Sequence, residues 1–229
     1  MLARARASVY RVGVLRLLGY REWTEGLGDD REWIIQVVQS GVYGLVSAEA
    51  ASMGAHVMPL RYDYMILLDS GAYPEGPRRI ASAASSVAPT PVSVSVACAP
   101  TPMDAQRAAS ADPGLYEECT PDPVAAVHLD VDDISSRTQR ESAYTTFEEV
   151  MDIVRAATGR ASSLGGLVQY LGGDNLIAFL PEGSLGEFLG FVRGLEGVKA
   201  GVGVHRIPRE AIALAAGDLR SIRASRSRG

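Results

Sequence analysis

Several residue types are scarce in this sequence, and each shortage excludes a class of protein. The chain of 229 residues has two cysteines, Cys98 and Cys119, which are too few and too far apart for a metal cluster and predict no disulfide framework. No apolar run approaches the roughly 18 to 20 residues of a membrane-spanning helix. Arg11 and Arg16 interrupt the N-terminal apolar stretch, so it lacks the core of a signal peptide. We therefore expect a cytoplasmic protein without a membrane segment.

Charge and composition narrow the choice of partner. The formal net charge of -5 argues against a protein that coats nucleic acid. The chain is rich in arginine, poor in lysine and nearly free of asparagine, which is typical of a hot organism or of a GC-rich genome. Hydrophobic residues make up 47% of the chain, enough for the core of one large domain or of two small ones.

Hydrophobic patterning predicts the same order of elements twice: strand, helix, two strands around a tight turn, helix, strand and helix. In the second half these elements are expected at residues 125–132, 142–158, 167–180, 184–195, 198–207 and 208–225. In the first half they are expected at 11–18, 30–54, 56–69, 77–87, 91–99 and 101–110. Two structural repeats of about 110 residues are therefore predicted.

This order of elements is the split βαβ arrangement. We predict an α+β protein with two ferredoxin-like repeats of the palm type, each an antiparallel sheet with helices on one face. The repeats are expected at residues 1–111 and 124–229, joined by the polar, proline-rich linker 112–123. A second copy of the unit is expected to cover the other face of each sheet, as a pseudo-two-fold pair.

The only asparagine of the chain, Asn175, lies in the stretch QYLGGDNLIAF, which predicts a hairpin with Gly-Gly-Asp-Asn at its tip. Asp174 at this tip and Asp130 at the end of the repeat's first strand are expected to point into one space. Two such carboxylates suit Mg²⁺, which also keeps waters and substrate phosphates. Turn chemistry at Asp174, and helix capping by Asp132 and Asp133, are the alternative interpretations.

The polar turn after this strand is a candidate phosphate site. Residues 132–136 precede a helix, where free backbone N–H groups can bind phosphate oxygens. Ser135 and Ser136 can cap that helix or contact phosphate. His128 lies two residues before Asp130, so strand alternation puts both side chains on one face. His128 is either a proton-transfer residue or a histidine satisfied within the sheet.

These motifs, in their order, resemble the palm-type nucleotide cyclases and GGDEF domains, and more closely the archaeal GTP cyclohydrolase III family. The second half of that family carries HIDINN followed by GGDN, which correspond to His128–Asp133 and Gly172–Asn175. AGVGV at 200–204, SIR at 221–223 and SVSVACAPTPMDAQ at 93–106 extend the resemblance over nearly the whole chain.

The resemblance implies a reaction and a cofactor. The family hydrolyses the imidazole ring of GTP at C8, retains the formyl group, and cuts the triphosphate with release of inorganic phosphate. The product is a formamidopyrimidine ribonucleotide monophosphate, a precursor of riboflavin and deazaflavin. The family uses Mg²⁺, with K⁺ expected to assist. A zinc-dependent ring opener would instead need a cluster of Cys and His ligands.

The resemblance also assigns roles to residues. Asp130 and Asp174 would be catalytic metal ligands, with the carbonyl of Val131 as a third oxygen. The other nucleotide-binding residues implied in this half are Asp132, Asp133, Ser135, Gly173, Asn175 and Arg223. Asn175 either reads the guanine edge or holds the hairpin. Arg223 either contacts phosphate or is a plain cation near a helix C-terminus.

The first half departs from the family pattern. The family carries an acidic residue at the end of its first strand, where this chain has Leu18 and Gly19, and Leu18 is expected to correspond to Asp130. Asp63 remains in the RYDYM stretch, but a lone carboxylate holds Mg²⁺ poorly, so we expect no metal in this half. Asp63 is instead expected to bind the nucleotide by shaping the pocket for the base. Tyr62, with Tyr64, either stacks on guanine or packs in the core.

Two other functions stay open. The same metal pair would serve a nucleotidyl cyclase by activating a ribose hydroxyl, and a catalytically inactive GTP-binding sensor would explain the lost acidic residue. Exposed sheet edges and the habit of the family both predict a homo-oligomer, either a dimer or a tetramer.

Overall fold

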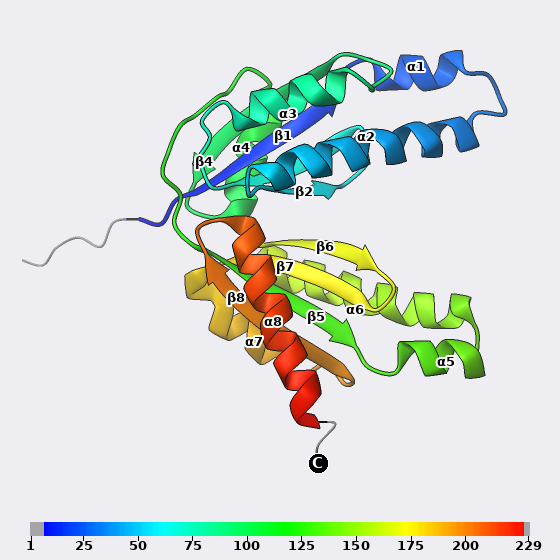
Figure 1. Ribbon diagram of the computed structural model, residues 1–229, viewed down its shortest axis with the longest axis vertical. Coiled ribbons are helices and arrows are strands. Elements are labelled where there is room, and N and C mark those ends of the chain that lie inside the picture. The colour runs from blue at the N-terminus through cyan, green and yellow to red at the C-terminus, as the bar shows by residue number, and fades with distance from the viewer. Residues whose placement is uncertain (1–6, 227–229) are drawn as a thin grey trace, which may run out of the picture. The chain divides into compact units, whose positions relative to one another are not determined.

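The computed structural model describes residues 7–226 and divides the chain into two compact units (Figure 1). The first unit comprises the residues up to 100 together with 104–122, and the second comprises 101–103 together with the residues from 123 onward. Each unit contains one antiparallel four-stranded sheet. Among the described residues, no helix combines the length and the apolar character that crossing a membrane requires.

The strand order is β2-β3-β1-β4 in the first sheet and β6-β7-β5-β8 in the second. The elements up to the end of the first unit are β1 (Tyr10–Leu17), α1 (Tyr20–Gly26), α2 (Glu32–Ser52), β2 (His56–Pro59), β3 (Tyr64–Asp69), α3 (Gly76–Ser85), β4 (Val92–Ala99) and α4 (Pro102–Ala111). Those that follow are β5 (Val124–Val131), α5 (Ile134–Arg140), α6 (Ala143–Ser163), β6 (Leu167–Gly172), β7 (Asn175–Pro181), the 3₁₀ helix η1 (Glu182–Ser184), α7 (Leu185–Val192), β8 (Val198–His205) and α8 (Pro208–Arg226). This repeated βαββαβ order confirms the predicted fold class.

The predicted order of elements does not contain two short helices that the structure has. Helices α1 and α5 have seven residues each and follow the first strand of their repeats. Two turns of helix are too short for a 3.6-residue period to be recognised, and neither helix contains a buried residue. The strands and the longer helices lie within a few residues of their predicted positions.

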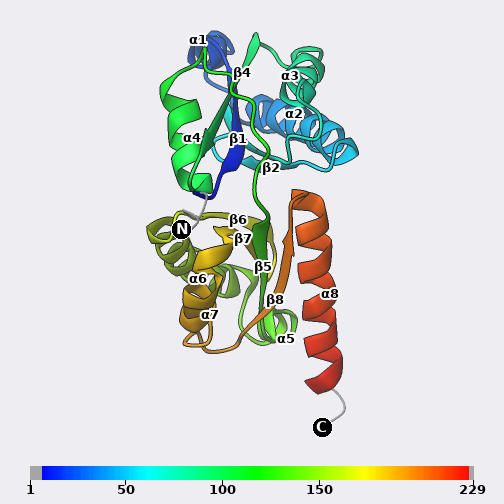
Figure 2. The same ribbon diagram turned by 90° about the vertical axis from the view of Figure 1, so that its left-hand side faces the viewer.

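Helices cover both faces of each sheet (Figure 2). In the second unit, Ala157 of α6 and Phe188 of α7 pack against Leu129 of β5 on one face. Helix α8 packs on the opposite face, and α4 packs similarly in the first unit, where Ala109 contacts Val14. The last helix of each repeat therefore covers the face for which the sequence predicted only a second copy.

Two glycines bring α8 unusually close to β8. A Cβ atom at Gly201 would lie 2.2 Å from the carbonyl oxygen of Ala215, and one at Gly203 would lie 2.1 Å from that of Ala211. No side chain fits at either position, so the AGVGV stretch sets the distance between strand and helix. Because α8 runs back along β8, its last turns lie beside the end of β5.

The expectation that the cysteines form no disulfide is wrong. Cys98, in β4, is bonded to Cys119 with 6.5 Å between their Cα atoms. The segment after α4 returns along the free edge of β4, where Val96 exchanges two backbone hydrogen bonds of 2.9 Å with Leu115 and Glu117. This pairing brings the two thiols together, and a separation of 21 residues in the sequence does not reveal it.

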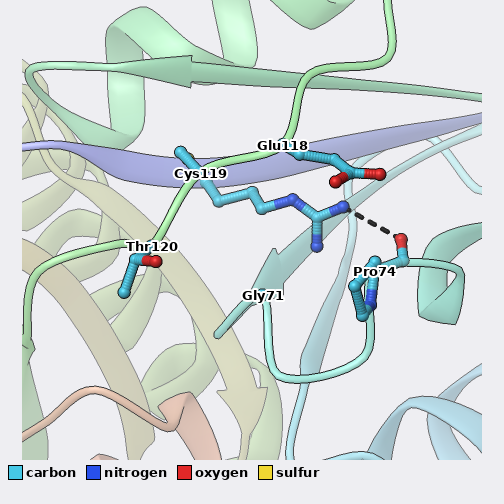
Figure 3. Close-up of a pocket in the computed structure, with 6 residues that line it drawn as sticks. Gly71, Pro74, Glu118, Cys119 and Thr120 are labelled. Atoms are coloured by element: carbon cyan, nitrogen blue, oxygen red, sulfur yellow. Dashed lines mark hydrogen bonds between the residues drawn. The ribbon is translucent and has the colours of Figure 1, made fainter.

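Arg11 also fixes this returning segment. Its buried guanidinium forms an ion pair with Asp69 and donates a hydrogen bond of 3.4 Å to the carbonyl of Glu117. It also donates a hydrogen bond of 3.2 Å to the carbonyl of Pro74, which Figure 3 shows as a dashed line. Together with Cys119 and Gly71, it lines a pocket of about 320 Å³. Residues 112–122, predicted as part of a linker, are thus attached to the first unit along their length.

Reduction of the disulfide is expected to destabilise the first unit. A crosslink that closes a loop of this length restricts the unfolded chain by about 3 kcal/mol of unfolding free energy. Urea unfolding with and without a phosphine reductant would measure the loss. The Cys98→Ala/Cys119→Ala double variant should be equally destabilised and insensitive to reductant. An unchanged free energy, with both thiols shown to be free, would contradict the expectation.

The close approach of α8 predicts opposite effects for two Gly→Ala substitutions. Gly201→Ala forces the helix away from the strand and should lower the free energy of unfolding by about 1–3 kcal/mol, as overpacking does. Gly217→Ala, in α8 itself, places its Cβ where no heavy atom lies within 4 Å. It should raise the free energy by about 0.5–1 kcal/mol through helix propensity. Thermal or urea unfolding checks the pair, and a neutral Gly201→Ala would refute it.

Candidate functional site

The candidate site lies at the end of β5, on the face of the second sheet that α8 covers. Asp130 is paired in register with Asn175 of β7 on one side and with Lys199 of β8 on the other. Directly opposed residues of antiparallel strands project from the same face, so these three side chains form a row across the sheet. His128 joins this face two residues earlier, opposite Gly201.

Asp130 is a buried carboxylate bound by a guanidinium. Only 4% of the residue is exposed. Arg223 of α8 donates from Nε to Oδ2 at 3.2 Å and from Nη2 to Oδ1. The Arg223 side chain itself is 48% exposed. A carboxylate removed from water is costly unless a cation compensates it, so this bidentate pair stabilises the buried charge.

The two aspartates that follow also have cationic partners. Asp132 forms an ion pair with Lys199, which is the single lysine of the chain. Asp133 is the left-handed N-cap of α5, with φ 60°. Hydrogen bonds from Ser136 and then Arg140 lower the pKa of its exposed carboxyl group. Acidic and basic groups therefore alternate around the end of β5.

A chain of hydrogen bonds connects His128 to the hairpin tip. The Asn175 amide nitrogen donates to the Asp174 carboxylate, so the Asn175 Oδ1 atom is left as an acceptor. His128 Nε2 lies 2.9 Å from that oxygen, and it must therefore carry the proton of this bond. Asn175 is therefore the link between a sheet histidine and the hairpin carboxylate.

The backbone places the hairpin tip against the end of β5. Gly172 and Gly173 have φ angles of 104° and 60°, which disfavour other residues, and nothing lies within 4 Å of a Cβ added to either. Val131 donates its N–H to the carbonyl of Asp174 at 3.0 Å. The carbonyl of a strand residue points to the same neighbour as its N–H, so the Val131 carbonyl faces this hairpin.

The donor set suits a hard divalent cation. Asp130, Asp174 and the carbonyl of Val131 offer oxygen ligands only, from two adjacent strand ends. Within residues 7–226, no group of three or more His, Cys, Asp or Glu side chains is arranged to hold a metal ion. Mg²⁺ characteristically takes one or two carboxylates and completes its shell with water and substrate phosphates. These oxygen donors are therefore of the kind that Mg²⁺ takes.

The hydrogen bonds of the two repeats correct the predicted correspondence between them. The hydrogen bond from Leu17 N–H to the Asp63 carbonyl matches that from Val131 N–H to the Asp174 carbonyl. The bond from Leu18 N–H to the Pro91 carbonyl likewise matches that from Asp132 N–H to the Gly197 carbonyl. The next residues, Gly19 and Asp133, are both left-handed N-caps. Leu18 therefore corresponds to Asp132, and not to Asp130 as predicted. The counterpart of Asp130 is Arg16, because each lies one residue before the residue that donates its N–H to the hairpin carbonyl.

Arg16 gives the first unit a fixed cation where the second has a carboxylate. The residue is 4% exposed and donates to Ser95 Oγ and to the Ser110 carbonyl, both at 2.9 Å, and to the Ala109 carbonyl. These two carbonyls lie in the last turn of α4, where the helix dipole favours positive charge. The ring of Tyr64 lies 5.7 Å from the guanidinium carbon.

Other predicted residues belong to elements outside the row on the second sheet. Tyr62 and Asp63 belong to the β2–β3 turn of the first unit. Tyr62 has a left-handed backbone (φ 63°) and packs edge-on against Tyr43. Arg61 holds the Asp63 carboxylate through two hydrogen bonds. Ser135 is exposed in the first turn of α5.

Sequence reasoning missed Lys199 and Arg16. Lys199 is the only lysine in the chain and occupies an otherwise apolar strand, and this isolation was a usable signal. Arg16 ends an apolar strand in the first half, but its role depends on a register that the sequence does not state.

Comparisons with known proteins match the same family over almost the whole chain. A family model described as GTP cyclohydrolase III matches residues 12–229. The GTP cyclohydrolase III of Aeropyrum pernix is 38% identical over 221 residues, which cover 93% of this chain and 92% of that protein. The GTP cyclohydrolase III of Pyrobaculum arsenaticum is 32% identical over 226 residues, which cover 96% and 98%.

A solved structure of a sensory box/GGDEF family protein from Caulobacter crescentus is also similar. The similarity covers 45% of this chain and 80% of that one, at 14% identity and a TM-score of 0.38. A score of this size supports no inference about the fold or the function.

Asn175→Ala is expected to free the hairpin carboxylate and to weaken the fold. The variant removes the acceptor for His128 and the donor to Asp174, which should cost about 1–2 kcal/mol of unfolding free energy. Urea unfolding would measure the loss, and exchange of the His128 Nε2 proton, followed by NMR, should become faster. Ser163→Ala, in an exposed helix end of the same unit, is a matched control expected to change neither. Unchanged proton exchange in Asn175→Ala would contradict the link.

Proposed function

The chain belongs to the GTP cyclohydrolase III family, and from this premise we propose that it opens the imidazole ring of GTP by hydrolysis at C8. The proposed product is 2-amino-5-formylamino-6-(5-phospho-ribosylamino)pyrimidin-4(3H)-one, formed with release of inorganic phosphate, and it would serve as a precursor of riboflavin and of the deazaflavin F420. The family match over residues 12–229 is the observation that carries the proposal. The arginine bound to Asp130, and the backbone bond that holds the Asp174 hairpin tip against the end of β5, support a site for a metal-bound triphosphate.

Mg²⁺ would be held by Asp130, Asp174 and the Val131 carbonyl. When bound, it would supply positive charge to the phosphate oxygens and stabilise the charge that develops as they leave. Both carboxylates are positioned by other parts of the protein, Asp130 by its place on a central strand and Asp174 by the amide of Asn175. Each carboxylate is therefore held in place before a ligand binds.

The cations around β5 would bind and orient the triphosphate. Arg223 and Lys199 project from α8 and β8 towards the end of β5, where each pairs with an aspartate. Arginine matches phosphate with two parallel hydrogen bonds, whereas lysine acts as a point charge. The turn beside Asp132, from Asp133 to Ser135, would add backbone N–H donors, and the open space at Gly173 would admit the ligand.

His128 would act on the hairpin rather than on the substrate. Its Nε2 proton is committed to Asn175, and this bond fixes the side chain that in turn holds Asp174. We therefore interpret His128 as a residue that positions a metal ligand. This differs from the proton-transfer role that its place beside Asp130 suggested.

Incubation of the purified protein with GTP, Mg²⁺ and K⁺ tests the proposal. The expected product is a ring-opened monophosphate identified by chromatography with mass detection, together with two inorganic phosphates per GTP. Asp130→Asn and Asp174→Asn each remove a metal ligand and should reduce turnover by about 100-fold or more, as the loss of a charge-stabilising group does.

Other outcomes would select a different function. Pyrophosphate and a cyclic nucleotide would identify a nucleotidyl cyclase. Unchanged GTP that binds in a manner dependent on Asp130 and Asp174 would identify a sensor. Full turnover by both Asn variants would show that the metal site has been placed incorrectly.

A further inference from the structure

The guanidinium of Arg223 occupies the oxygens that a metal ion at Asp130 would need. Both Asp130 oxygens accept hydrogen bonds from Arg223, one of them from Nε at 3.2 Å. A divalent cation on the same carboxylate would place two positive groups within a few ångströms of each other, where repulsion is strong at a buried site. The ion pair and the metal therefore compete for Asp130.

Arg223 can leave the carboxylate without disturbing the helix that carries it. Its side chain is 48% exposed, whereas Asp130 is 4% exposed, so only the arginine can move towards solvent. The body of α8 is fixed by its close packing on Gly201 and Gly203 and by Asp218, which accepts a hydrogen bond of 2.8 Å from the Val202 N–H. Rotation of one long side chain is therefore sufficient.

We propose that Arg223 is an exchangeable counter-ion, which holds Asp130 until a divalent cation binds and then transfers to the phosphates of the nucleotide. The proposal rests on the proposed function for its ligand. It goes beyond that function by giving one residue two successive partners. Buried Asp130 needs a cation at every stage, first the guanidinium and then the metal. The triphosphate, which arrives with excess negative charge, provides the new partner for the released arginine.

The exchange couples the binding of metal and nucleotide. The metal alone must break the Asp130–Arg223 pair without recovering its energy, so it should bind weakly. When the nucleotide is present, the freed guanidinium gains phosphate oxygens, and each ligand should tighten the binding of the other by the same factor. Arg223 is thus a positioning residue that pairs with Asp130 in the empty site and with phosphate when metal and nucleotide are bound.

Arg223→Met tests the exchange, with Arg220→Met as the matched control. Both variants remove one arginine from the same exposed stretch of α8, three residues apart, and both lower the positive charge equally. Calorimetric titration measures the affinity for Mg²⁺ without nucleotide, and then the affinity for a non-hydrolysable imido analogue of GTP with Mg²⁺. Thermal unfolding in a chelator measures the effect on the protein itself.

The expected results have opposite signs for the two ligands. Without the competing guanidinium, Arg223→Met should bind Mg²⁺ alone roughly 5- to 100-fold more tightly than the natural protein, the usual range of a coupling between sites. It should bind the analogue more weakly, and the mutual tightening should disappear. In chelator it should unfold at a lower temperature, because buried Asp130 has lost its cation, and Mg²⁺ should restore that temperature. Arg220→Met should match the natural protein throughout.

Several results would overturn the proposal. Mg²⁺ affinity in Arg223→Met that is equal to or lower than that of the natural protein would show that the arginine does not compete with the metal. Tighter Mg²⁺ binding without weaker analogue binding would contradict the transfer of Arg223 to the phosphates. Failure of both proteins to bind Mg²⁺ would also refute the exchange. These titrations need no turnover, so a protein that shows the exchange but does not open GTP would disprove only the proposed reaction.

Discussion

Asp130 is a nearly inaccessible carboxylate at the end of a central strand, and the cation that it requires determines how the second unit is built around it. A buried charge without a partner would cost several kcal/mol. The partner comes from α8, which reaches the carboxylate because Gly201 and Gly203 allow the helix backbone to lie directly on β8. The charge of Asp130 on β5 therefore depends on the two glycines of the neighbouring strand β8.

The first unit also has a buried charged group at this position, but its charge is positive and its partners are hydrogen-bond acceptors. Arg16 takes the place of Asp130, and its partners are the last carbonyl groups of α4 together with Ser95 Oγ. In both units a charged group at the end of the central strand is bound by the helix on the same face. Only the carboxylate can accept a metal ion. The buried arginine uses its donors inside the protein, so the repeats share a fold but not a chemistry.

The sequence was sufficient for the parts of this structure that depend on local pattern. Alternation predicted the strands, and Gly-Gly-Asp before an apolar run predicted the hairpin that places Asp174 beside β5. Interactions that depend on register were not predictable. The bond between Cys98 and Cys119 follows from a segment that returns along an edge strand, and the pairing of Asp132 with Lys199 follows from the order β5-β8. The number of residues between the members of each pair does not show that they are in contact.

The neutral partner of Asp174 sets it apart from the other aspartates of the site. Asp130 and Asp132 pair with cations, whereas Asp174 accepts a hydrogen bond from the amide of Asn175. A carboxylate at position 175 would repel Asp174 and could not donate to it, and an alkyl side chain would release His128. Among the described residues, the hairpin tip thus keeps a negative charge that no cation offsets. In the proposed exchange, a divalent cation would be attracted to this charge first and would then displace the guanidinium from Asp130.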